Sequence, residues 1–235
     1  PFGRNTAAAI AAAALEVERM HGPNEVMLVL AADHLITDQI GFEVAVDQAV
    51  TLAKNGQLVT FGIEPSAPET GYGYIEVDGY RVRRFVEKPN AAKAQEYLDS
   101  GSYLWNAGMF CFTAGTLIEQ MQQHCPKIIA ATRQCLDASR RTEDTYITQI
   151  ELHAENFMLV PEDSIDYAVM EKSQSIAVVP CRIGWSDIGS WTALGDLTDS
   201  DDQGNRVMGQ AMLHDTRNCT IQSSNRLVGT VGLDN

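Results

Sequence analysis

The chain has 235 residues, and its 31 acidic and 17 basic residues give a formal net charge of −14. This charge argues against a general nucleic-acid or membrane surface, because both need a basic footprint. The composition, 45% hydrophobic and 20% charged residues, is that of an ordinary globular protein. Its five cysteines form no C-x-x-C pair, so we expect reduced thiols and a cytoplasmic protein.

The first 63 residues alternate helical and strand-like patterns. The two apolar runs are continuous, which is typical of strands buried on both faces of a parallel sheet. Helix, strand, helix, strand is the alternation that predicts an α/β fold. The expected elements are helices over 5–20 and 37–54 and strands over 26–32 and 58–63.

The rest of the chain continues this pattern and then changes. From Gly204 onward short β segments alternate with turn residues. We therefore predict a main domain over 1–200 and the beginning of a C-terminal β segment over 201–235. Within the main domain we expect strands over 82–86, 109–112, 157–160 and 175–179 and helices over 91–98, 116–140 (interrupted by Pro126) and 165–171.

Glu87 and Lys88 stand together where the predicted strand 82–86 ends before Pro89. Neighbouring residues of a strand point to opposite sides. A carboxylate can accept hydrogen bonds from sugar hydroxyls, and an ammonium group is a compact charge suited to a phosphate. The alternative interpretation is an exposed ion pair on an edge strand.

Two aspartates follow predicted strands at distant places in the chain. Asp33 comes directly after the run 26–32, and Asp187 follows the strand 175–179 by a short loop. Open α/β sheets bind ligands at the carboxyl ends of their strands, and Mg²⁺ between substrate phosphates uses one or two carboxylates. The alternatives are that Asp33 caps the turn at His34 and that Asp187 caps a helix near Trp191.

Other residues give weaker signals. Gly71 and Gly73 allow close backbone approach to a ligand, although two glycines also fit a plain turn. Asn106 can present its amide to hydroxyl groups or can belong to a turn that enters a strand. Asp166 and Lys172 are six residues apart on one predicted helix and so lie on different faces.

Nine short motifs, in this order, resemble the bacterial mannose-1-phosphate guanylyltransferases (GDP-mannose pyrophosphorylases). Each motif is weak alone, but together they span essentially the whole chain. They are PFGRNTA (1–7), ADH (32–34), FGI (61–63), ETGYGYI (69–75), FVEKP (85–89), WNAGMF (105–110), SIDYAVMEK (164–172), GWSDIGSW (184–191) and NRLV (225–228).

The resemblance implies a Rossmann-like nucleotide-diphosphosugar transferase fold with a mixed, mainly parallel sheet flanked by helices. It also implies GTP and mannose 1-phosphate as substrates, GDP-mannose and pyrophosphate as products, and a divalent metal, Mg²⁺, as cofactor. It assigns the metal to Asp33 and Asp187, sugar contacts to Gly71, Tyr72, Glu87 and Asn106, the sugar phosphate to Lys88, the lining of the same pocket to Asp166 and Lys172, and the nucleotide to Arg4 and Asn5.

The family's glycine-rich loop, G-G-x-G-T-R-L, is absent from this sequence. Because that loop cradles the triphosphate, we expect this chain alone to be inactive. Two other interpretations stay open: a related nucleotidyltransferase with another base or sugar, and a degenerate module that only binds sugar phosphates. The resemblance is compatible with a homo-oligomer and with a fused phosphomannose isomerase domain in the parent protein.

Overall fold

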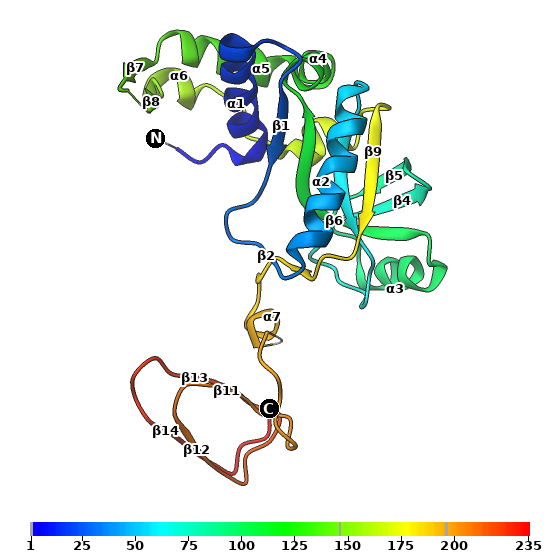
Figure 1. The fold of residues 1–235 in the computed structure, drawn as a ribbon, viewed down its shortest axis with the longest axis vertical. Coiled ribbons are helices and arrows are strands. Elements are labelled where there is room, and N and C mark those ends of the chain that lie inside the picture. Colours follow the sequence, from blue (N-terminus) through cyan, green and yellow to red (C-terminus); the bar gives the residue numbers. More distant parts are fainter. Residues whose placement is uncertain (1, 146, 196) are drawn as a thin grey trace. The chain divides into compact units, whose positions relative to one another are not determined.

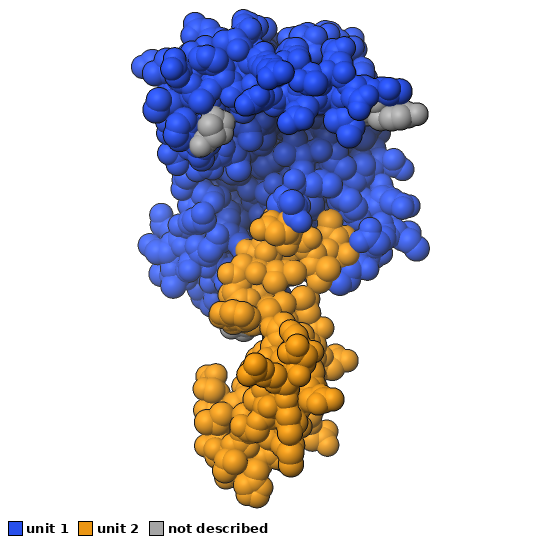
Figure 2. Space-filling model, turned by 90° about the vertical axis from the view of Figure 1, so that its left-hand side faces the viewer, with its two compact units in different colours: residues 1–32, 37–183 blue, residues 33–36, 184–235 orange. Residues whose placement is uncertain are grey.

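The computed structural model describes residues 2–145, 147–195 and 197–235, so Pro1, with which the first motif begins, lies outside the described residues. The chain divides into two compact units (Figure 2). Unit 1 comprises Pro1–Ala32 and Thr37–Ile183, and unit 2 comprises Asp33–Ile36 and Gly184–Asn235. The second and longer segment of unit 2 begins at Gly184, and the domain boundary expected at residue 200 stays a prediction.

Unit 1 is built on a six-stranded sheet in the order β1-β6-β3-β9-β5-β4. β3 and β9 pair in parallel, and the other described neighbours are antiparallel. Consequently β1, β3, β4 and β9 run in one direction, and β5 and β6 run in the other. The predicted mixed, mainly parallel α/β fold is confirmed in this sense. The strands are β1 (Val26–Val29), β3 (Leu58–Ile63), β4 (Tyr74–Asp78), β5 (Arg81–Val86), β6 (Tyr103–Thr113) and β9 (Ile176–Cys181).

Helices pack on this sheet and against one another (Figure 1). α2 crosses the sheet over β3, β6 and β9, whereas α1 packs against α4 and α5. Ala7, Ala11 and Ala14 on one side of α1 are fully buried, so their small side chains allow close helix packing. The elements are α1 (Asn5–His21), α2 (Gln39–Lys54), α3 (Ala91–Ser100), α4 (Ala114–His124), α5 (Pro126–Asp137), α6 (Ala154–Met158), the π-helical turn η1 (Asp166–Met170) and the hairpin β7 (Arg140–Glu143) with β8 (Thr148–Glu151).

Two predicted strands differ from the structure. The run 26–32 forms only the short strand β1, which lies at the sheet edge and leaves Leu28 38% and Leu30 46% exposed. β1 is therefore not buried on both faces, and among the described strands only β6 pairs with it. The run 157–160 is not a strand: it begins in α6, which His153 caps by accepting a hydrogen bond from the Asn156 amide at 3.4 Å.

Unit 2 begins with a short ladder and continues as two stacked coils. β2 (Leu35–Ile36) pairs antiparallel with β10 (Trp185–Ser186), and α7 (Trp191–Gly195) follows. The coils pair β11 with β13 and β12 with β14 in parallel. Their bounds are β11 (Arg206–Met208), β12 (Ala211–His214), β13 (Thr220–Gln222) and β14 (Val228–Val231).

No helix in the described parts of the chain combines the length and the apolarity that crossing a bilayer requires.

Candidate functional site

The predicted residue Asn106 lies in β6 and joins three elements of unit 1 through its side-chain amide. Its Oδ1 accepts hydrogen bonds from Thr60 Oγ1 of β3 at 2.8 Å and from the Gly108 amide at 3.3 Å. Its Nδ2 donates to Asp166 Oδ1, at the start of η1, at 2.9 Å. Since a backbone amide can only donate, the Gly108 contact fixes which end of the Asn106 amide faces Asp166.

Glu87 and Lys88 follow directly after β5, as predicted. The Lys88 ammonium lies 3.5 Å from Glu87 Oε1, and the Lys88 side chain is 62% exposed whereas that of Glu87 is 12% exposed. Lys88 has a φ of +46°, so the chain turns sharply at this residue. The two side chains therefore combine a mostly buried carboxylate with an ammonium group that reaches solvent.

Gly73 explains how Glu87 comes close to Asn106. A Cβ atom at position 73 would lie 2.4 Å from Glu87 Oε2 and 3.3 Å from the Asn106 Cβ. The Gly73 carbonyl also accepts a hydrogen bond from the backbone N–H of Asn106 at 2.8 Å. We refer to Glu87, Asn106 and Asp166 as the acceptor cluster.

Burial changes the acidity of the two carboxyl groups in the acceptor cluster. Burial raises the pKa of Glu87, and repulsion from Asp166 raises it further, while the nearby Lys88 charge lowers it. Burial also raises the pKa of Asp166, and this effect outweighs the opposing hydrogen bond from Asn106. Both carboxyl groups thus take up a proton at a higher pH than ordinary carboxyl groups.

Tyr72 packs against an aromatic ring, whereas Gly71 is open to solvent. The Tyr72 ring meets the ring of Trp105, the neighbour of Asn106, edge to face at 5.1 Å. Gly71 is exposed, and a Cβ atom there would meet nothing within 4 Å. Of the two glycines that the sequence singles out, Gly73 is the one that the packing around Glu87 requires.

The predicted nucleotide residues Arg4 and Asn5 lie at the start of α1. Arg4 Nη2 donates to the Met158 carbonyl at 2.7 Å, so its guanidinium is held against α6. The next residue, Thr6, accepts a hydrogen bond at Oγ1 from the Ile165 amide at 2.9 Å. The start of α1 is therefore tied to the residue that precedes Asp166.

Glu171, the neighbour of the predicted Lys172, contacts the acceptor cluster. Glu171 Oε1 accepts a hydrogen bond from the Glu87 amide at 3.3 Å, and its charge contributes to the raised pKa of Glu87. Lys172 is exposed, and its charge acts on the Cys125 thiol, whose pKa burial raises to about 11. The structure thus brings Asp166 and Glu171 to this place, and the role of Lys172 stays a prediction.

Asp33 and Asp187 both belong to unit 2, where the β2–β10 ladder brings their segments together. Leu35 pairs with Ser186, so Asp33 lies two residues before the ladder and Asp187 one residue beyond it. Asp187 Oδ1 accepts a hydrogen bond from the Gly189 amide at 3.0 Å. Asp187 therefore stabilises a turn, and the cap of α7 is Ser190, whose Oγ accepts from the Ala193 amide at 3.0 Å.

Trp185 and His34 contact each other at this ladder. Trp185 Nε1 donates to His34 Nδ1 at 3.2 Å, with the two rings edge to face. Among the described residues, no group of three or more His, Cys, Asp or Glu side chains is placed to hold a metal. Two carboxylates fit Mg²⁺ only where substrate phosphates and water complete its octahedral shell.

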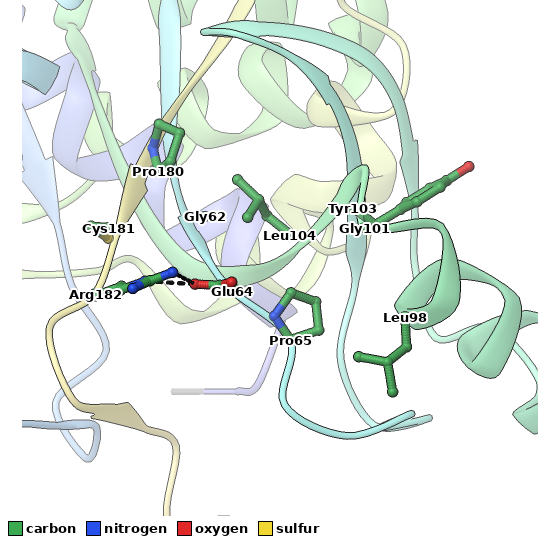
Figure 3. A pocket seen from close by; sticks show the side chains of 10 residues that line it. All are labelled: Gly62, Glu64, Pro65, Leu98, Gly101, Tyr103, Leu104, Pro180, Cys181 and Arg182. Atoms are coloured by element: carbon green, nitrogen blue, oxygen red, sulfur yellow. Dashed lines mark hydrogen bonds and ion pairs between the residues drawn. The ribbon is translucent and has the colours of Figure 1, made fainter.

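A cavity of about 400 Å³ lies elsewhere in unit 1 (Figure 3). Glu64 and Arg182 face each other as an ion pair on one side, and Leu98 and Gly101 lie on the other side. None of the predicted site residues lines it. The cavity is lined by Gly62, Glu64, Pro65, Leu98, Gly101, Tyr103, Leu104, Pro180, Cys181 and Arg182.

Sequence reasoning missed Thr60 and Glu171 in this site. Thr60 is an ordinary strand residue by its pattern, and only the pairing of β3 with β6 brings its hydroxyl to Asn106. Glu171 is adjacent to Lys172 in the motif SIDYAVMEK, so the motif itself is the signal that could have found it.

The chain matches known proteins over its whole length. A family described as nucleotidyl transferase matches residues 1–204. A mannose-1-phosphate guanylyltransferase of Klebsiella pneumoniae is 45% identical over all of this chain and 51% of its own length. Xanthan biosynthesis protein XanB of Xanthomonas campestris is 46% identical over all of this chain and 50% of its own length. The chain thus spans about half the length of these curated relatives.

Solved structures agree with this relationship. A Thermus thermophilus structure described as mannose-1-phosphate geranyltransferase superimposes with a TM-score of 0.87 and 33% identity, over 99% of this chain and 67% of that one. A Helicobacter pylori structure described as mannose-6-phosphate isomerase superimposes with a TM-score of 0.74 and 35% identity, over 79% of this chain and 71% of that one. With the family match and the mixed α/β sheet, these similarities show that the chain belongs to the nucleotidyl transferase family.

Proposed function

We propose that this protein makes GDP-mannose and pyrophosphate from GTP and mannose 1-phosphate. The names of its relatives support this reaction, and the acceptor cluster beside Lys88 is the observation in the chain itself that carries it. Hydroxyl groups of a sugar find acceptors in Glu87 and Asp166, and the phosphate finds a cation in Lys88. One compact site therefore offers both chemistries that a sugar phosphate needs.

In this reaction the sugar phosphate is itself the nucleophile. An oxygen of mannose 1-phosphate attacks the α-phosphorus of GTP, the bond from that phosphorus to the oxygen bridging it to the β-phosphorus breaks, and pyrophosphate leaves. The protein then needs no nucleophile of its own, and its residues act by positioning and electrostatics. Lys88 holds the phosphate, and Asp166 and Lys172 line the same pocket. The sugar is contacted by Gly71, Tyr72, Glu87 and Asn106.

Asp33 and Asp187 are the residues that would hold Mg²⁺ in this proposal. Their segments lie together at the β2–β10 ladder, and both are hard oxygen ligands. When bound, Mg²⁺ supplies positive charge that offsets the charge of the phosphates.

The start of α1 is proposed to face the nucleotide. Its tie to Ile165 brings Asn5 and Arg4 to the segment that carries Asp166. The glycine-rich phosphate loop of the family is not in this sequence, so we expect residues 1–235 alone to give no turnover.

The decisive experiment incubates the intact protein with GTP, mannose 1-phosphate and Mg²⁺ and follows GDP-mannose by ³¹P NMR. Parallel reactions with UTP, ATP or glucose 1-phosphate test the related nucleotidyltransferases. Turnover with one of these alone would replace GTP or mannose in the proposal. Binding of mannose 1-phosphate without any turnover in the intact protein would favour the degenerate binding module.

Two further parts of the proposal concern the protein as a whole. The half-length coverage of the relatives and the similarity to a structure described as mannose-6-phosphate isomerase support a fused isomerase domain. Interconversion of mannose 6-phosphate and fructose 6-phosphate by the intact protein tests it. All five cysteines are free thiols, which supports a reducing, cytoplasmic location. A homo-oligomer stays a prediction.

A further inference from the structure

Thr60 is a polar residue in the middle of an otherwise apolar strand. It is fully buried in β3, between Val59 and Phe61, which are also fully buried. Its Oγ1 lies 2.8 Å from Asn106 Oδ1 and 3.3 Å from the Met109 carbonyl, and both of these atoms are acceptors. The Thr60 hydroxyl therefore donates its single proton toward β6, mainly to Asn106.

These contacts form a one-way series of hydrogen bonds. Thr60 and the Gly108 amide both donate to Asn106 Oδ1, which leaves Nδ2 to donate to Asp166. Without its two donors the Asn106 amide could rotate, and its Oδ1 would then oppose the carboxylate. A carboxylate has room for about four hydrogen bonds, so the bond from Asn106 leaves acceptor capacity for a ligand hydroxyl.

We propose that Thr60 is a positioning residue that acts through Asn106 to keep the Asp166 carboxylate ready to accept a hydroxyl of the sugar phosphate. This inference rests on the proposed function for the identity of the ligand, but not for the series of hydrogen bonds. Thr60 does not touch the substrate in this view. Its effect is transmitted by the orientation of one amide.

The charges around Asp166 make its pKa depend on the orientation of the Asn106 side-chain amide. Asp166 faces Asn106 and the charge of Lys88, and its neighbour Glu87 faces Lys88 and Glu171. Asp166 is thus a half-buried carboxylate close to the acidic Glu87, and burial already raises its pKa. Removing a donor that favours the charged form raises that pKa further.

The test compares Thr60→Val, which keeps the shape and removes the hydroxyl, with Thr60→Ser, which keeps the hydroxyl. In the intact protein with ¹³C-labelled aspartate, the Asp166 signal, assigned with Asp166→Asn, reports the pKa directly. We expect Thr60→Val to raise this pKa and to weaken mannose 1-phosphate binding roughly 2- to 12-fold, the range of one neutral hydrogen bond. Thr60→Ser should restore both values to near those of the wild type.

A Thr60→Val protein that is less stable but has an unchanged Asp166 pKa would overturn the proposal. A second measurement, on the wild type, tests the step from Asn106 to Asp166 even where that variant does not fold. The ¹⁵N and ¹H signals of the Asn106 side-chain amide should shift as Asp166 titrates. Signals that do not change during this titration would also refute the proposed series of hydrogen bonds. If the wild type does not bind mannose 1-phosphate, the proposed function fails. These titrations still test the series of hydrogen bonds in that case.

Discussion

The two sets of carboxylates singled out in this chain are held in opposite ways. In unit 1, Glu87 and Asp166 are withdrawn from solvent and tied to neighbouring side chains and amides. In unit 2, Asp33 is exposed, and its segment is joined to that of Asp187 by a ladder only two residues long. The first set lies next to the six-stranded sheet of unit 1, and the second lies next to a ladder of two residue pairs.

This difference indicates how much of each site the protein supplies by itself. The acceptor cluster already has its hydrogen bonds, so a hydroxylated ligand meets a preorganised surface. In the proposal, the aspartates of unit 2 would supply two ligands for an ion that takes six. Their site should be completed by the phosphates of the substrates, which makes metal binding depend on the nucleotide.

The largest effect is expected from the aspartates of unit 2. Asp33→Asn and Asp187→Asn should each lower turnover of the intact protein by about 10²-fold or more, comparable to the loss of one strong electrostatic contact. Rates measured at limiting Mg²⁺ test this, and Asp202→Asn, an exposed aspartate of the same unit, is the matched control. Near-normal rates in both variants would remove these residues as ligands.

Lys88→Ala should have the next largest effect and should separate the two substrates. The lost ammonium group faces the sugar phosphate in our proposal, so the KM for mannose 1-phosphate should rise roughly 10- to 150-fold, as for a charged hydrogen bond. The KM for GTP should change much less. Lys93→Ala, an exposed lysine in α3, serves as control, and equal losses for both substrates would place Lys88 elsewhere.

The sequence predicted best where the signal is local. The helix expected over 37–54 is α2, and at its start Asp38 Oδ1 accepts a hydrogen bond from the Gly41 amide at 2.9 Å. The run 157–160 was expected to be a strand because a short apolar run does not distinguish a strand from a buried helix. In the structure the His153 side chain caps α6, so the run begins in a helix.

The candidate site shows the same limit. Glu87, Lys88, Asn106 and Asp166 could be singled out by motif, and the structure brings them together. The contact of Thr60 with Asn106 could not be predicted, because it depends on an irregular register between β3 and β6 near Gly62. A β-bulge of this kind re-aims a side chain without leaving a signal in residue type.

The acceptor cluster should make ligand binding more sensitive to pH than an exposed site would be. Because the pKa values of Glu87 and Asp166 are raised, their acceptor forms are complete above these values and are lost as pH falls through them. Affinity for mannose 1-phosphate should then fall by up to about tenfold per pH unit and per proton, starting at a higher pH than for ordinary carboxyl groups. Calorimetric titrations between pH 4 and pH 8 measure this.

The raised pKa of Asp166 also makes the free energy of unfolding depend on pH. A raised pKa in the folded state means that ionising Asp166 costs stability above that pKa, and that the cost disappears as pH falls below it. Asp166→Asn, which cannot ionise, should therefore gain free energy of unfolding relative to the wild type at pH 8 and lose that advantage in acid. Urea unfolding at both pH values tests the sign, and a constant difference would show that burial of this charge is unimportant.

The smallest effect should come from a methyl group at Gly73, and Gly71 provides its control. A Cβ atom at position 73 would meet Glu87 Oε2 at 2.4 Å, whereas one at position 71 would meet nothing within 4 Å. Because the far end of the Glu87 side chain can move, Gly73→Ala should displace the carboxylate rather than unfold the protein. Returning the carboxylate to its place for the ligand should then cost about 1 kcal/mol, the lower end of the range typical of overpacking, which corresponds to about a fivefold loss in mannose 1-phosphate affinity. Gly71→Ala should leave that affinity unchanged. If the two variants behave alike, the packing around Glu87 does not shape the sugar site, and the contrast between a preorganised unit 1 and an incomplete unit 2 loses its support.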